Sequence, residues 1–221
     1  AADHGLDWTP VPTAEATRRQ QEEFKKRSGY AVSTAAKAIH PTIRGLETDA
    51  RIVGMGSEIG RGYYYRLSDS ERTDIDGERL LERLNRPVHP EIAADLDDWL
   101  HELAGLDTYT TLDLAYQEHR LGCWSGPQYL GILEDCDVIS PFCYRPVIEL
   151  MHRTSPDFRR FDRLQGHIID RRWSELNGYP VNAYAGLSRW RNLGDRLKRV
   201  RTGLSRPGDA WRYVRGTYFG R

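Results

Sequence analysis

The sequence has few cysteines, the residues whose disulfide bonds stabilise many small extracellular proteins. It contains three cysteines, Cys123, Cys136 and Cys143, and none lies in CxxC spacing. An odd number without paired spacing argues against a disulfide framework or a zinc knuckle. We therefore expect reduced thiols that pack as small hydrophobic side chains, and a cytoplasmic location.

Other familiar patterns are also missing. The seven histidines show no HxxxH or HExxH spacing, which argues against a zinc-enzyme helix. Ser125 lacks the G-x-S-x-G frame of a nucleophile elbow. No apolar run approaches the roughly 20 residues that span a membrane, and no signal peptide is recognisable at the N-terminus. The chain starts at Ala1 without methionine, which suggests a fragment or a processed product.

The net charge of the chain is zero, since 32 Lys and Arg balance 32 Asp and Glu. The charged residues are nevertheless unevenly distributed along the sequence. Residues 183–221 contain ten Lys and Arg against two Asp, a local charge of +8, with aromatic residues between them. Overall neutrality makes the nucleic-acid signal weak. The basic segment suits an anionic partner such as a nucleic acid, an anionic membrane or an acidic protein. A solvated extension without a specific ligand is the simpler interpretation.

The residue pattern predicts short strands among many helices. Thr13 is expected to cap a helix from Ala14 to about Arg27, which Gly29 ends. Leu6 to Val11 and Ala50 to Val53 have the composition of short strands. Apolar spacing and turn residues predict further helices at Ser33 to Ile39, Gly77 to Leu84, Pro90 to Leu103, Thr108 to Leu121, Pro141 to Met151 and Phe161 to Trp173.

The stretch from Gly54 to Gly62 carries most of the candidate chemistry. Four glycines among nine residues allow a backbone to pass close to a ligand. Glu58 is a carboxylate suited to a magnesium ion on a polyphosphate, and Arg61 lies within reach of an anion. The alternative is a structural glycine turn in which Glu58 caps the next helix. Chemistry alone favours neither interpretation.

The same stretch, Gly54-Met55-Gly56-Ser57-Glu58-Ile59-Gly60-Arg61-Gly62-Tyr63-Tyr64, resembles the G-E-G-[AS]-D-E-x-F-G-G-Y motif of the synthetase domain of asparagine synthetases. It is closer to the shorter form in bacterial asparagine-synthase-related proteins. Segments similar to the family follow in the same order at Leu114 to Trp124, Ser140 to Glu149 and Arg163 to Pro180. Residues 1–8 resemble the helix and second strand after the family's phosphate loop. The likeness covers roughly residues 1–182 and leaves 183–221 as a basic, aromatic-rich extension.

The resemblance implies an α/β, predominantly helical fold. The chain would be the C-terminal part of a parallel-sheet, adenine-nucleotide α-hydrolase-like domain with a helical C-terminal half. It implies a carbon–nitrogen ligase that forms an amide through an acyl-adenylate, with ATP and Mg²⁺ as cofactors. The substrates would be a small-molecule carboxylate and an amine donor.

The resemblance also implies roles for individual residues. Glu58 stands where the family has its magnesium-binding aspartate, as the catalytic and metal-binding residue. The implied nucleotide and pyrophosphate contacts are Gly54, Gly56, Ser57, Arg61 and Arg120. For Arg120 the alternative is an ordinary charge on a solvated helix face.

Several departures from the family pattern favour a second hypothesis. The S-G-G-x-D-S phosphate loop is not in this chain and is expected to precede Ala1. Met55 replaces a glutamate, and Val181-Asn182 stands where the family places a catalytic lysine. The family's E-x-R pair becomes Asp137 and Ile139. A non-catalytic, degenerate relative that serves as a binding or scaffold protein would show such losses.

Overall fold

The computed structural model describes residues 5, 14–32, 48–66, 68–131, 136–160 and 163–178. These fall into two compact units. The sheet unit lies within Ala1–Ser57 and Ala115–Val147, and the helical unit lies within Glu58–Leu114 and Ile148–Arg221. The strand predicted at 6–11, the helix predicted at 33–39 and the extension 183–221 lie outside the described residues.

The first helix of the sheet unit, α1 (Arg18–Arg27), begins later than the sequence predicts. Thr17, not Thr13, is the N-cap, because Thr17 and Gln20 form a reciprocal capping box. The Thr17 N–H donates to Gln20 Oε1 at 2.9 Å, and the Gln20 N–H donates to Thr17 Oγ1 at 3.4 Å. The predicted end is confirmed, with Gly29 in the left-handed region at φ +61°.

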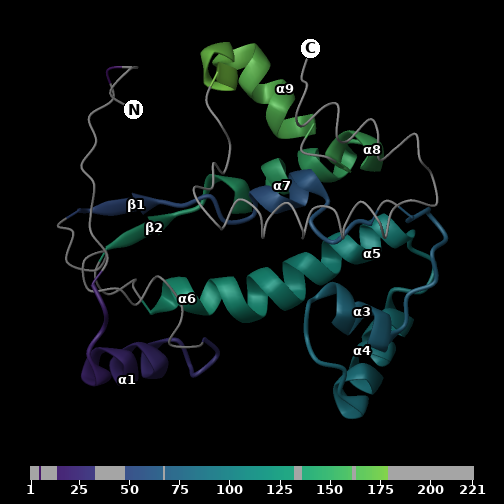
Figure 1. Cartoon of the computed structure of the whole chain (residues 1–221), viewed down its shortest axis with the longest axis horizontal. Coiled ribbons are helices and arrows are strands. Elements are labelled where there is room, and N and C mark those ends of the chain that lie inside the picture. The colour runs from purple at the N-terminus through teal and green to yellow at the C-terminus, as the bar shows by residue number, and fades with distance from the viewer. Residues whose placement is uncertain are drawn as a thin grey trace, which may run out of the picture. The chain divides into compact units, whose positions relative to one another are not determined.

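Two short strands lie side by side in the sheet unit (Figure 1). They are β1 (Ala50–Ile52) and β2 (Asp137–Ile139), which pair in parallel with Ile52 opposite Ile139. The predicted strand at β1 is confirmed, whereas β2 is not recognisable from sequence. On one face Val138 packs against the buried pair Phe24 and Val32, the core of this unit.

A run of helical segments without a break in sequence follows in the middle of the chain. It comprises α5 (Thr108–Ala115), the π-helix η4 (Tyr116–Ser125) and α6 (Gly126–Leu130). The Gly126 N–H reaches back five residues to Leu121 O, and Pro127 has no N–H to donate. The prediction of a helix from Thr108 to Leu121 is confirmed, but its second half has the rarer π geometry, which often marks functional segments.

In the helical unit, α3 (Gly77–Arg83) and α4 (Pro90–Glu102) form a closely packed pair and match their predicted ranges. Asp76 caps α3, and the Gly77 N–H donates to Asp97 Oδ1 at 2.6 Å. A Cβ on Gly77 would lie 2.0 Å from Ala93 O. The two helices therefore approach so closely that only glycine fits at this point.

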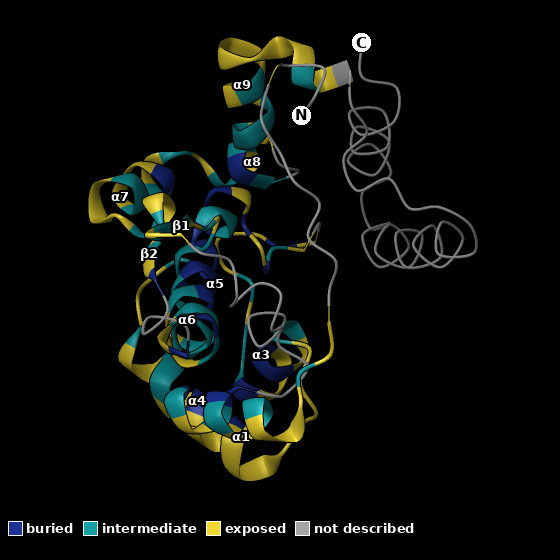
Figure 2. Cartoon of the chain, turned by 90° about the vertical axis from the view of Figure 1, so that its left-hand side faces the viewer, coloured by how far each residue is buried: buried dark blue, intermediate teal, exposed yellow. Residues whose placement is uncertain are grey.

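The C-terminal part of the described chain is helical, as predicted, in shorter pieces. These are η5 (Pro141–Cys143), α7 (Arg145–Arg153), α8 (Pro156–Arg159), α9 (Arg163–Arg172) and η7 (Ser174–Gly178). The helix predicted from Pro141 starts at Arg145 instead, because Tyr144 is extended at ψ 125°. Figure 2 shows α9 without buried residues.

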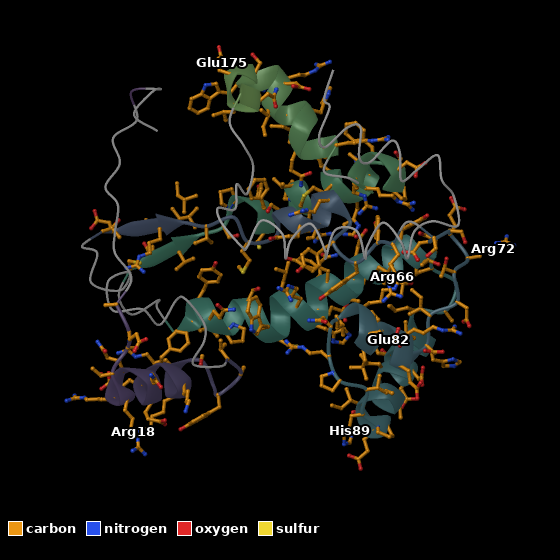
Figure 3. The ribbon with its side chains drawn as sticks, viewed as in Figure 1. Arg18, Arg66, Arg72, Glu82, His89 and Glu175 are labelled. Atoms are coloured by element: carbon orange, nitrogen blue, oxygen red, sulfur yellow. The ribbon has the colours of Figure 1, made fainter. Side chains whose placement is uncertain are left out.

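Charged side chains occupy the surface of the helical unit. Arg66, Arg72, Glu82 and His89 are exposed, and Arg72 extends away from the ribbon in Figure 3. No helix in the described part of the chain is long and apolar enough to cross a membrane. The described chain is thus mostly helical with a small parallel sheet, in agreement with the predicted fold class at that level.

Candidate functional site

The glycine turn follows directly on β1. The ladder continues one step beyond the strand, where the Val53 N–H donates to Ile139 O at 2.9 Å. The turn then closes through a bond of 3.2 Å from the Ser57 N–H to Gly54 O. It thereby lies at the carboxyl end of a parallel strand, the edge at which open α/β sheets bind ligands.

The glycines of this stretch differ in what surrounds them. Gly54 is exposed, and a Cβ there would meet no atom of the described residues within 4 Å. Gly56 is buried with φ +91°, and a Cβ there would lie 2.9 Å from Cys143 Sγ and 3.0 Å from Phe142 O. A Cβ on Gly60 would lie 2.9 Å from Leu164 Cδ2. Among the described residues, the space beside the α-carbon is therefore open at Gly54, whereas the α-carbons of Gly56 and Gly60 face the protein's own packing.

The segment after β2 contacts the turn. Ser140 Oγ donates to Met55 O at 2.8 Å, and Cys143 Sγ donates to the same oxygen at 3.4 Å. Ser140 and Cys143 lie far from Met55 in sequence, and both belong to the sheet unit. The parallel pairing of β1 with β2 brings the two segments together, since both leave the same end of the sheet.

Glu58 and Arg61 lie on the short 3-10 helix η3 (Ser57–Arg61). Side chains three residues apart in a 3-10 helix project from the same side, so the carboxylate and the guanidinium share one side of η3. Glu58 is half-buried and Arg61 is exposed. This order of charges suits a cation bound to a polyphosphate next to a group that binds its oxygens.

Arg120 lies in the π-helix η4, where its guanidinium stacks on the Trp124 ring at 4.7 Å from the centroid. This cation–π contact holds the side chain along its own helix. A role for Arg120 in nucleotide binding stays a prediction.

The residues fit a magnesium ion only as part of a nucleotide complex. Among the residues that the structure describes, no three His, Cys, Asp or Glu side chains gather where they would hold a metal ion. Mg²⁺ on a nucleotide takes most of its ligands from phosphate and water and needs one or two carboxylates from the protein. Glu58 fits that requirement as a single ligand.

A second group of polar residues lies buried in the helical unit. Asp113 on α5 and Arg159 at the end of α8 form an ion pair in which each residue is 2% exposed. The Tyr65 hydroxyl donates to Asp113 Oδ2 at 2.8 Å, and Arg159 Nε donates to Thr154 O at 3.2 Å. Burial raises the pKa of Asp113, and the neighbouring Arg159 opposes this effect. The contacts tie α5, α8 and the stretch around Tyr65 together, which is a structural role.

A second buried pair lies in the same unit. Arg83 donates to both carboxylate oxygens of Asp69, at 2.6 and 2.7 Å. The Tyr109 hydroxyl donates to Asp69 O at 2.6 Å and accepts from Arg160 at 2.6 Å. Bidentate pairing of this kind lowers the cost in free energy of burying the two charges of Arg83 and Asp69.

His152 makes the stability of this unit depend on pH. Its Nδ1 lies 3.6 Å from Asp113 Oδ2, and burial holds the pKa of His152 below its usual 6.5. In the unfolded chain the imidazole takes up a proton as the pH falls through about 6.5, whereas the folded state resists protonation. We therefore expect the free energy of unfolding to fall below that pH.

Urea unfolding at about pH 7.5 and pH 5.5 tests this expectation. The loss of stability between the two pH values should be smaller in His152→Gln than in the parent protein. The raised pKa of Asp113 acts in the opposite direction, so the comparison between variants, and not the slope alone, isolates His152. An equal loss in both proteins would contradict the assignment.

In comparisons with known proteins, no family model, no curated protein and no solved structure matches this chain. The functional interpretation of the glycine turn therefore depends on its residues and its geometry.

Two sets of contacts, one in each unit, were not predicted from sequence. Ser140 and Cys143 lie far from Met55 in sequence, and nothing local marks them as its partners. The pair Asp113 and Arg159 is separated by 46 residues, and neither lies in a recognisable motif. A local signal does exist in the spacing of Ser140 and Cys143. These residues are three apart and Pro141 lies between them, so in a 3-10 turn both side chains would project from the same side of the backbone.

Proposed function

We propose that this chain carries the glycine-turn half of an ATP-dependent amide-forming site of the asparagine-synthetase type. The observation that supports it is the adjacency of Gly54–Ser57 and Ser140–Cys143 at the carboxyl ends of β1 and β2. Each segment separately resembles a block of that family. Their contact is what a nucleotide site at this edge of an α/β sheet requires.

The proposed reaction has two steps. A carboxylate oxygen of the substrate attacks the α-phosphorus of ATP, and the bond to the β-phosphate breaks with its electron pair leaving on pyrophosphate. The nitrogen of the amine donor then attacks the acyl carbon, AMP leaves, and the nitrogen loses a proton to form the amide. A magnesium ion held by Glu58 and the nucleotide would neutralise the charge that develops on the leaving pyrophosphate.

The residues of this chain take separate parts in the proposal. Gly54 would leave space for the nucleotide at the strand end, since no described atom lies within 4 Å of a Cβ there. Glu58 provides the carboxylate for the nucleotide-bound ion. Arg61, on the same side of η3, would pair with phosphate oxygens. Such donors act on charge that appears as the reaction proceeds, which is where electrostatic groups accelerate a reaction most.

ATP–pyrophosphate exchange in the full-length gene product tests the proposal. Exchange should require Mg²⁺ and one carboxylate from a panel of amino acids and other small acids. Glu58→Ala should lower the exchange rate about 100-fold or more, because it removes the protein ligand of the catalytic ion. Glu102→Ala removes an exposed carboxylate at the end of α4 and should leave the rate unchanged.

The alternative, a non-catalytic relative, predicts a different result. Such a protein would bind MgATP without exchange for any carboxylate in the panel. Unaltered exchange in Glu58→Ala would instead reject the assigned role of Glu58 and leave the reaction class standing.

A further inference from the structure

One carbonyl in the glycine turn is held by two side chains. Ser140 Oγ and Cys143 Sγ both donate to Met55 O, at 2.8 and 3.4 Å. The donors are fixed relative to each other by the 3-10 helix η5, in which the Cys143 N–H donates to Ser140 O at 3.0 Å. Residues three apart in such a helix project from one side, so both donors reach the same oxygen.

The next residue of the turn rests on the same segment. A Cβ on Gly56 would lie 2.9 Å from Cys143 Sγ and 3.1 Å from Phe142 C, and the φ of +91° suits glycine alone. The peptide between Met55 and Gly56 therefore contacts the Ser140–Cys143 segment at two points, the carbonyl oxygen of Met55 and the α-carbon of Gly56. Its orientation is set by that segment.

This orientation also fixes where the amide of that peptide points. In a trans peptide the C=O and N–H bonds are antiparallel, so the Gly56 N–H points away from the two donors. Gly56 is buried, and within the described residues its N–H makes no hydrogen bond. An N–H without a partner in a buried residue is uncommon and costs free energy, so it needs an explanation such as an absent water, ion or ligand.

We propose that Ser140 and Cys143 are positioning residues that set the Met55–Gly56 peptide so that the Gly56 N–H donates to an anionic oxygen of the bound nucleotide. The inference rests on the proposed function, which supplies that nucleotide. Neither side chain needs to touch the nucleotide, because both act through the peptide that they hold.

The test compares four variants with the parent, in the full-length gene product. Ser140→Ala and Cys143→Ala each remove one donor, their combination removes both, and Cys143→Ser retains a donor at the second position. Hydrogen exchange measured by mass spectrometry reports the turn directly. The peptide that covers Gly54 to Arg61 should exchange faster in the double variant, whereas the peptide that covers α4 should not change.

The kinetic readout separates positioning from simple destabilisation. Loss of one hydrogen bond corresponds to about 2- to 10-fold in binding, so each Ala variant should raise the KM for MgATP by about that factor. The double variant should raise it more, with the thermal midpoint close to the parent value. Cys143→Ser should restore the KM to within about 2-fold of the parent, since a hydroxyl also donates.

The outcomes are distinguishable. Unchanged exchange of the Gly54 to Arg61 peptide in the double variant overturns the proposal, and so does faster exchange with an unchanged KM. A parent protein that shows no ATP–pyrophosphate exchange but binds MgATP is compared through its Kd instead. A parent that neither exchanges nor binds refutes the proposed function and the positioning role with it, while the hydrogen-exchange result still shows whether the two side chains hold the turn.

Discussion

Asp113→Ala is expected to lower the free energy of unfolding by about 3–5 kcal/mol, because it leaves the buried Arg159 guanidinium without its counter-ion. Both residues are 2% exposed, so water cannot replace the lost carboxylate. Asp113 also accepts the Tyr65 hydroxyl at 2.8 Å, and this bond is lost as well. Urea unfolding, followed by circular dichroism, measures the change.

Two matched variants sharpen this prediction. Tyr65→Phe removes one neutral donor and leaves the ion pair, so the expected loss is only about 1 kcal/mol. The double variant Asp113→Leu with Arg159→Met replaces both charges by apolar side chains and is expected to be more stable than Asp113→Ala alone. If Asp113→Ala costs no more than Tyr65→Phe, the pair does not stabilise the helical unit.

Gly77→Ala is expected to destabilise the helical unit by about 3 kcal/mol or more, at the upper end of what overpacking costs. The added Cβ would lie 2.0 Å from Ala93 O and 2.8 Å from Ala93 C, which are backbone atoms that cannot rotate away. Separation of α3 from α4 would also break the bond from the Gly77 N–H to Asp97 Oδ1. Thermal unfolding measures the loss.

The chain provides a control for this substitution. Gly166 also lies in a helix, α9, but within the described part of the chain a Cβ there would meet no atom within 4 Å. Gly166→Ala should therefore stabilise the protein by up to about 1 kcal/mol through helix propensity. A similar response of both variants would show that α3 and α4 do not approach as closely as the structure has them.

Local sequence patterns were sufficient to predict most of the described helices. Apolar spacing at Leu96, Leu100 and Leu103 predicts α4, and the amphipathic pattern of residues 77–84 predicts α3, because each helix buries one stripe of its own residues. The start of α1 was misplaced, since Thr13 and Thr17 are both good caps and the choice depends on Gln20. The π geometry of η4 has no local pattern to predict it.

The second strand and the partners of the glycine turn were not predictable in this way. β2 is only three residues long, too short for its pattern to predict a strand. The role of its apolar Val138 becomes clear only from its packing against Phe24 and Val32. The donors Ser140 and Cys143 reach Met55 because two strands pair, a contact between positions more than 80 residues apart. The sequence of either segment alone does not indicate which other segment it will contact.

The sequence alone determined most of the described helices, the strand β1 and the glycine turn that follows it. These are properties of neighbouring residues, set by backbone sterics and by the period of the apolar side chains. Only the tertiary structure decided which carbonyl of the turn accepts hydrogen bonds from distant side chains. It also decided beside which glycines protein atoms occupy the space of a Cβ, and which charged side chains are buried as ion pairs. Those outcomes depend on contacts between residues distant in the chain, and such contacts follow from the packing of the whole unit.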